Sequence, residues 1–173
     1  DWACDDCTSL EIITIPESVT KIGTIAFLRC SSLKSITIPE SVTEIGNSAF
    51  SCCSSLENIT IPDSVTRIGE GAFVNCASLK SITIPESVTK IEDSTFFSCT
   101  SLKSIVISKG VKEIGTTAFY GCTSLKSIII PESVTEIAST AFSGCASLEC
   151  VTFLSRTKIR EEVHSKKKKK VFL

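Results

Sequence analysis

The chain has 173 residues, of which 42% are hydrophobic, a composition that excludes an intrinsically disordered protein. Its net charge of −1 combines two unlike segments, because residues 1–155 carry 10 basic and 17 acidic side chains while residues 156–173 carry 8 basic and 2 acidic ones. No apolar run approaches the ~18 residues of a membrane-spanning helix, so we expect no transmembrane segment in this chain.

A 23-residue repeat runs through the first segment. Seven cysteines recur at this interval, and a leucine follows each of them three residues later. The cysteine column comprises Cys7, Cys30, Cys53, Cys76, Cys99, Cys122 and Cys145. A repeat of this length predicts a solenoid, in which each unit covers the apolar side chains of its neighbours.

Within one unit the expected elements follow each other in chain order. Residues 35–38 read Ser-Ile-Thr-Ile, and this alternation predicts a strand with two inward and two outward side chains. Pro39 then ends the strand, because it cannot donate a ladder hydrogen bond. Ile45, Ala49 and Cys53 are four residues apart, which is helical spacing. Each unit is therefore predicted to be a short strand, a bend and a short helical return.

These elements predict an α/β solenoid of about six to seven repeats over residues 1–155, wound as a right-handed superhelix. Because strands are narrower than helices, we expect a parallel β-sheet on the concave face and short helical or irregular turns on the convex face. Residues 156–173 abandon the repeat, and their charge predicts a solvated, disordered basic tail.

The unit closely resembles the BspA-like class of leucine-rich repeats. The likeness rests on the pattern Leu-x-x-Ile-x-Ile-Pro-x-x-Val-x-x-Ile-Gly-x-x-Ala-Phe-x-x-Cys, which extends over residues 3–153. That family occurs in surface-exposed proteins of bacteria and in large sets in protist parasites. The resemblance implies a non-catalytic, protein-binding domain of a cell-surface or secreted protein, with a host, matrix or cell-surface protein as partner. It supplies no catalytic residues and no cofactor.

The concave face is the expected binding surface, and its outward side chains form two columns. Most are short hydroxyl side chains, which also suit exposed strands without any ligand. Val106 and Ile129 are adjacent apolar exceptions with Cys150 on their diagonal, so we expect contact there first. The predicted ligand-binding set is Ser35, Thr37, Asn58, Thr60, Ser81, Thr83, Ser104, Val106, Ser127, Ile129, Cys150 and Thr152.

The cysteine column is expected to consist of buried, unbridged thiols, because a free cysteine packs as a small hydrophobic residue. Cys4 and Cys7 have the spacing of a redox or zinc pair, but no second pair exists at zinc spacing. A terminal disulfide or no bond at all is the expectation for these two, with no metal site. Cys52 and Cys150 lie off the column and are predicted to be exposed, reactive thiols.

The sequence also disfavours catalysis. The single histidine, His164, lies in the tail, away from any nucleophile of the repeats, so we expect neither an enzyme nor a cofactor. The run Lys166 to Lys170 supports an alternative, an intracellular scaffold directed by this polylysine segment, without specific nucleic-acid binding. A third hypothesis, at long odds, is an ice-binding Ser/Thr face. The oligomeric state stays open.

Overall fold

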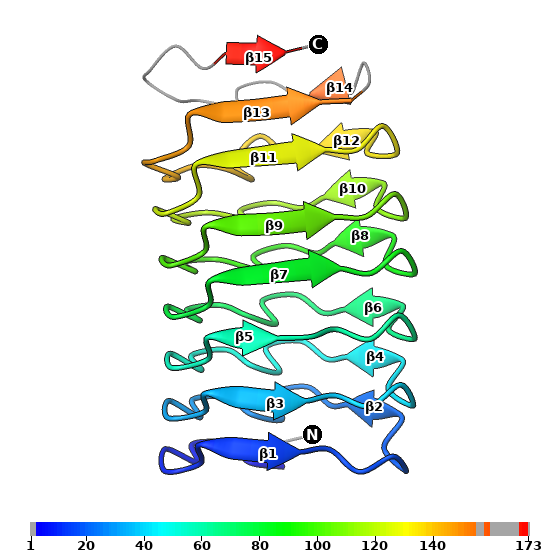
Figure 1. Cartoon of the computed structure of the whole chain (residues 1–173), viewed down its shortest axis with the longest axis vertical. Helices are drawn as coiled ribbons and strands as arrows, with labels where there is room; N and C mark the ends of the chain where they lie inside the picture. The colour runs from blue at the N-terminus through cyan, green and yellow to red at the C-terminus, as the bar shows by residue number, and fades with distance from the viewer. Residues whose placement is uncertain (1–2, 155–157, 160–169, 173) are drawn as a thin grey trace.

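The computed structural model describes residues 3–154, 158–159 and 170–172. The chain winds into a stack of coils in which the same elements lie above one another (Figure 1). We number a coil from the residue that precedes its first strand, so that complete coils span 11–33, 34–56, 57–79, 80–102, 103–125 and 126–148. The architecture is thus a parallel-sheet solenoid, as the repeat predicts.

The first wall of the stack is a ladder of parallel strands, in two hydrogen-bonded sheets, in which residues of successive complete coils pair with a step of 23, such as Ile13 with Ile36. Ser127 and Cys150 pair in the same way near the other end. The strands of this ladder are β1 (Ile12–Thr14), β3 (Ser35–Thr37), β5 (Asn58–Ile59), β7 (Ser81–Ile84), β9 (Ser104–Ile107), β11 (Ser127–Ile130), β13 (Cys150–Phe153) and β15 (Lys170–Phe172).

A second ladder of two-residue strands forms another wall of the stack, beside and behind the first in Figure 1. Its strands also pair in parallel, within two sheets and with a step of 23 residues between complete coils, such as Ile22 with Ile45. The members are β2 (Lys21–Ile22), β4 (Glu44–Ile45), β6 (Arg67–Ile68), β8 (Lys90–Ile91), β10 (Glu113–Ile114), β12 (Glu136–Ile137) and β14 (Lys158–Ile159). The spacing of Ile45, Ala49 and Cys53 predicts that Ile45 lies in a helical return, whereas Ile45 belongs to β4 of this second ladder.

The third wall corrects the predicted helical return. Across residues 3–154 the coils close through consecutive turns, and the described part of the chain contains no helix. The α/β class and the helical turns are therefore not confirmed, whereas the irregular turns that the prediction also allowed are present. The expected concave strand face depended on a wider helical wall opposite the strands. The described residues contain no helix, so this reason for curvature does not apply. Nor do the described residues include a helix with the length and apolarity that crossing a bilayer requires.

The hydrogen bonds of the third wall explain why a helix does not form. Alternate amides bond to the next coil instead of to the preceding turn: Phe50 N–H donates to the Ala72 carbonyl at 2.8 Å and Cys52 N–H to the Val74 carbonyl at 2.7 Å. Ser48 and Cys52 adopt positive φ angles of 52° and 61°, which a right-handed helix does not allow. Inter-coil hydrogen bonds replace the helical ladder and stabilise this conformation.

The core lies between the three walls and repeats its residues in columns. The phenylalanine column stacks along the whole stack, with adjacent ring centroids 5.3–5.5 Å apart and planes within 9° of parallel. Leu56, Leu79 and Leu102 have no exposed surface. Full burial of one such side chain contributes roughly 1.5–3 kcal/mol, so stacking supplies the stability that a single coil lacks.

At the C-terminal end, β14 pairs with β12, and β15 pairs with β13. The predicted tail, residues 156–173, otherwise lies outside the described residues, as do His164 and Lys166–Lys169. The predictions of a disordered tail and of a targeting function for its lysines therefore stay predictions.

Candidate functional site

The candidate site is the outward side of the first ladder, which we call the strand face. Strand alternation positions it: in β7, β9 and β11 the second and fourth side chains are buried and the first and third are exposed. All twelve predicted ligand-binding residues lie on this face. Ten of them are exposed, while Cys150 and Thr152 are half-buried in β13, where the ladder continues into β15.

Hydroxyl and amide side chains cover the part of the strand face that belongs to β3, β5 and β7. In the three coils concerned the exposed residues of the strand sequence are Ser35 and Thr37, Asn58 and Thr60, and Ser81 and Thr83. No charged residue interrupts these two columns. This part of the face can form hydrogen bonds, but it presents little apolar surface to a partner.

The strand face changes character at β9 and β11. Val106 is 57% exposed and Ile129 is 58% exposed, although β-branched apolar side chains are usually buried. The two residues occupy the same column in adjacent coils, and Ile129 pairs with Thr152 of β13. A third exposed apolar residue, Ile12 at 68%, lies at the opposite end of the face. Val106 and Ile129 thus form the one pair of exposed apolar side chains in adjacent coils of the described strand face.

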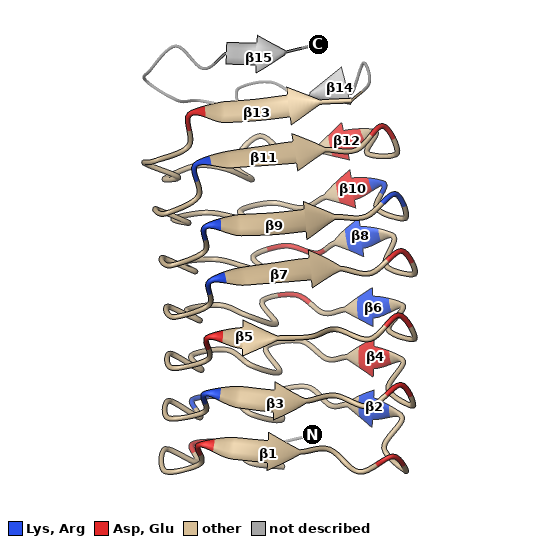
Figure 2. Ribbon diagram, in the orientation of Figure 1, with Lys and Arg blue, Asp and Glu red and all other residues tan. Residues whose placement is uncertain are grey.

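Lysines flank this apolar pair. Figure 2 shows basic residues at the start of β7, β9 and β11, and the residues before these strands are Lys80, Lys103 and Lys126. Lys103 and Lys126 line a shallow hollow together with Ser124 and Ser147. Within the described residues, neither lysine forms an ion pair, whereas Lys80 pairs with Glu57.

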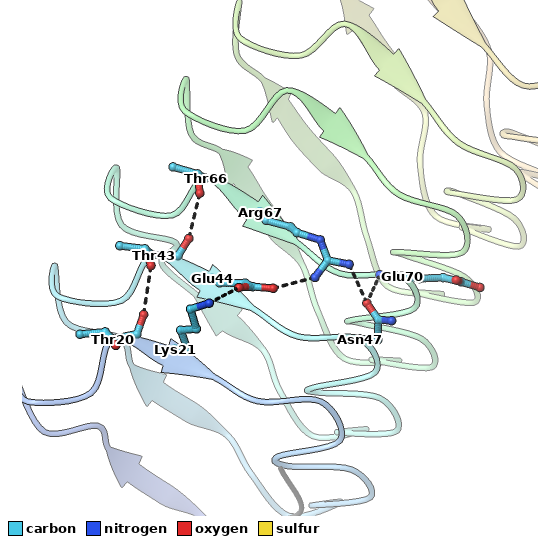
Figure 3. A network of polar contacts seen from close by, with 8 residues as sticks. All are labelled: Thr20, Lys21, Thr43, Glu44, Asn47, Thr66, Arg67 and Glu70. Carbon is cyan, nitrogen blue, oxygen red and sulfur yellow. Dashed lines mark hydrogen bonds and ion pairs between the residues drawn. The ribbon is translucent and has the colours of Figure 1, made fainter.

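Outside the coils of Lys103 and Lys126, each basic side chain of residues 3–154 forms an ion pair along the stack. Figure 3 shows Lys21, Glu44 and Arg67 in three successive coils, with the Glu44 carboxylate 3.0 Å from Lys21 Nζ and 2.8 Å from Arg67 Nη1. Hydrogen bonds from Lys21 and Arg67 lower the pKa of Glu44. Arg67 also donates to Asn47 Oδ1, which accepts the Glu70 amide as well. These side chains form ion pairs with neighbouring coils. Their charges are therefore better explained by coil stacking than by ligand binding.

The cysteine column has the structure that the sequence predicts: the thiols are free, and those from Cys30 to Cys145 are buried. Each of these thiols donates to a carbonyl 26 residues earlier, such as Cys76 Sγ to the Phe50 carbonyl at 3.1 Å. Burial raises the pKa of the Cys53 and Cys99 thiols to about 12. Protonated, hydrogen-bonded thiols of this kind are poor nucleophiles. These cysteines therefore pack the core and are not candidates for a catalytic site.

The cysteines outside the buried column differ in part from expectation. Cys52 and Cys150 are half-buried, not fully exposed. The Asn75 amide lies 3.7 Å from Cys52 Sγ, and the Thr152 hydroxyl lies 3.6 Å from Cys150 Sγ. Cys4 and Cys7 are free, and the pKa of Cys4 is raised by burial and by Cys7. The part of the chain that the structure describes contains no group of three or more His, Cys, Asp or Glu side chains placed to hold a metal.

Strand alternation in the sequence identifies Val106 and Ile129 but not the lysines around them. Coil 103–125 has Lys109 where other coils have Glu or Asp, and Lys112 where they have Thr. It also has Gly110 in a column of serines, and a Cβ on this glycine would lie 1.8 Å from the Glu86 carbonyl oxygen. A comparison of the exposed columns between repeats would have revealed these departures.

Comparison with known proteins agrees with the repeat. The family model described as "BspA type Leucine rich repeat region" matches residues 1–115 and 48–170, in six copies. No curated protein matches the chain.

Solved structures of bacterial leucine-rich repeat proteins have the same fold. A leucine-rich cell surface protein from Faecalibacterium prausnitzii A2-165 is 41% identical, with a TM-score of 0.80, over 88% of this chain and 42% of that one. The leucine-rich repeat protein of T. pallidum is 36% identical, with a TM-score of 0.76, over 82% of this chain and 72% of that one. A leucine-rich repeat protein from Bacteroides ovatus is 28% identical, with a TM-score of 0.61, over 89% and 58%. The chain spans less than half of the Faecalibacterium protein.

Proposed function

Because the chain belongs to the BspA-type leucine-rich repeat family, we propose that it is a protein-binding domain of a cell-surface or secreted protein and that its strand face contacts the ligand. The observation that carries this proposal is the exposed pair Val106 and Ile129 on an otherwise polar face. Adjacent exposed apolar side chains on a soluble surface are typical of contact sites. The cell surface protein from Faecalibacterium prausnitzii supports an extracellular location.

The architecture supports binding in a second way. The backbone of the strand face is fixed by parallel pairing within two sheets, since β9 pairs with β7 and β11 pairs with β13, and β9 and β11 lie next to each other where the two sheets meet. Its hydroxyl, valine and isoleucine side chains have few rotatable bonds, so they lose little conformational entropy when a partner immobilises them. A rigid face of this kind recognises a partner by shape and leaves the core undisturbed.

The test replaces the two apolar residues with the threonine that most other coils have at this position. Replacing Val106→Thr and Ile129→Thr inserts the residue that other coils carry in this column, so the coils should still fold. The labelled chain is applied to an immobilised basement-membrane extract, and binding is titrated. We expect the double variant to lose about tenfold or more in affinity, because truncation of a buried apolar contact costs more than about 1 kcal/mol.

The matched control is Thr37→Val with Thr60→Val, which makes the reverse exchange in the same column at β3 and β5. This control should bind like the original chain. Equal binding by the Val106/Ile129 variant and the original chain would contradict the placement of the site. Absence of saturable binding by the original chain would contradict the choice of a matrix partner.

A further inference from the structure

We infer that the strand face at β9 and β11 recognises an acidic peptide segment with an apolar side chain between its carboxylates. This inference rests on the proposed function and specifies the chemistry of the partner. The basic–apolar patch consists of Val106 and Ile129 together with Lys103, Lys109 and Lys126.

The first argument is the local charge. Coil 103–125 has three lysines and one glutamate, a net charge of +2, whereas every other complete coil from residue 11 to residue 148 is neutral or negative. Residues 1–155 as a whole have a net charge of −7. An acidic partner is therefore repelled by most of the stack and attracted to this coil, which gives specificity for one position.

The second argument is that these lysines are available. Lys103, Lys109, Lys112 and Lys126 are exposed, and no ion pair involves any of them within the described residues. Lys90 shows the opposite behaviour one coil earlier, because Nζ lies 3.1 Å from Glu92 and 3.8 Å from Glu113, and the hydrogen bond with Glu92 raises its pKa. Among the described residues, the lysines of the patch therefore form no ion pair that would hold them away from a ligand.

The third argument is geometric. Lys103 precedes β9 and Val106 is its third residue, so about 10 Å separates their Cα atoms at the usual rise of a strand. Lys109 follows the same strand on the other side of Val106. Lysine stems can lie along apolar surface and keep their ammonium groups in water. An apolar ligand side chain on Val106 and Ile129 therefore has cations on both sides.

The fourth argument is that coil 103–125 keeps the apolar core of the stack while its exposed charges change. Its inward residues Val111, Phe119, Cys122 and Leu125 have no exposed surface, like their equivalents in other coils. Ser108 and Gly110, which replace a proline and a serine of other coils at the exit of the strand, are the departures in less exposed columns. Val106, Lys109 and Lys112 fall on exposed columns, where folding does not select the residue and a partner can.

The experiment pans a phage-displayed random peptide library on the immobilised chain. Selected peptides are then measured in solution against three variants and at rising NaCl concentration. Lys103→Glu with Lys109→Glu introduces residues that other coils carry in these columns, so the fold should tolerate them. Lys21→Glu with Lys34→Glu makes the same change of net charge at the opposite end, and Val106→Thr with Ile129→Thr removes the apolar pair. Circular dichroism and thermal unfolding verify that each variant is folded.

We expect peptides enriched in Asp and Glu around an apolar residue. Their affinity should fall about tenfold or more for the Lys103/Lys109 variant, decrease with salt, and be unchanged for the Lys21/Lys34 variant. Apolar peptides that are sensitive to the Val106/Ile129 variant alone would overturn the acidic preference and leave the proposed function standing. Peptides insensitive to both variants, or the selection of no peptide, would overturn the inference and the placement of the site together.

Discussion

Coil 34–56 and coil 103–125 fold around the same interior but present different surfaces. In both coils the buried valine, phenylalanine, cysteine and leucine columns have no exposed surface, at Val42, Phe50, Cys53 and Leu56 and at Val111, Phe119, Cys122 and Leu125. Their outer residues differ at Thr37, Glu40 and Thr43 as against Val106, Lys109 and Lys112. Buried columns are shared between neighbours and so are fixed by stacking, while outer columns are free to vary.

The difference indicates where function is to be sought in a repeat protein. A residue that every coil carries serves the stack, and its presence says little about a ligand. A residue that one coil changes on its outer side, while its interior is intact, is not explained by folding. The following experiments test whether the two coils are truly alike inside and different outside, beginning with the largest expected effect.

The strongest test removes a ring from each coil. Phe50→Ala and Phe119→Ala should each lower the free energy of unfolding by about 3–5 kcal/mol, because a fully buried aromatic ring is replaced by a cavity. Each ring also stacks on two neighbours, with Phe119 5.4 Å from Phe96 and 5.3 Å from Phe142. Urea denaturation followed by circular dichroism measures both variants. A cost below about 1 kcal/mol for Phe119→Ala alone would mean that coil 103–125 is loosely packed.

The buried thiols provide a test through pH. Burial raises the pKa of the Cys53 thiol from its ordinary value of 9.0 to about 12, and it raises the pKa of Cys122 in the same direction. Above pH 9 the unfolded chain loses these protons while the folded chain keeps them. The unfolding free energy should therefore fall by about 1.4 kcal/mol per pH unit for each thiol, up to about pH 12.

Denaturation at pH 8, 9, 10 and 11 measures this slope. Cys53→Ala and Cys122→Ala should each make the slope shallower by one thiol, whereas Cys52→Ala, whose thiol is half-buried, serves as the neighbouring control. The lysine titration is common to all three variants and cancels in the comparison. An unchanged slope in Cys122→Ala with a reduced one in Cys53→Ala would show that the two interiors are not equivalent.

The smallest expected effect concerns the junctions that follow the two coils. Ser64 Oγ donates to the Val42 carbonyl of coil 34–56 at 2.7 Å. Ser133 occupies the same column after coil 103–125, and its buried hydroxyl has no partner among the described residues. Ser64→Ala should cost about 1 kcal/mol, since it removes a hydrogen bond, and Ser133→Ala should cost nothing measurable or stabilise slightly. Thermal unfolding compares the two, and equal losses would mean that both junctions are bonded alike.

The sequence predicted the first ladder well and the return poorly, for a physical reason. Alternation at residues 35–38 is a local property, and β3 has the buried and exposed sides that it implies. The interval of four between Ile45, Ala49 and Cys53 fits a helix equally well as a pair of turns with positive φ at Ser48 and Cys52. The amides that decide between them bond to the next coil, which a single repeat does not contain.

The candidate site divides in the same way. Val106 and Ile129 could be selected from the sequence because strand alternation places them outward. The column of Lys103 can be read in the same way, since the residues 23 positions away are lysines, whereas Lys34 and Lys80 each have a glutamate there. The unpaired state of Lys126 cannot, because Glu149 lies 23 residues after it and only the structure shows that the two form no ion pair.

The amino-acid order is enough to predict the 23-residue period, the buried columns and the outward columns of the first ladder, because all three follow from which side chains must avoid water. The turn wall, the short-strand ladder and the pairing of each charge depend on how the coils stack, because hydrogen bonds and ion pairs between coils join residues 20 or more positions apart, as between Arg67 and Asn47. Whether a side chain is buried follows from its own polarity and its position in the repeat. The partner of a polar group, in contrast, is known only once the neighbouring coil has been placed beside it.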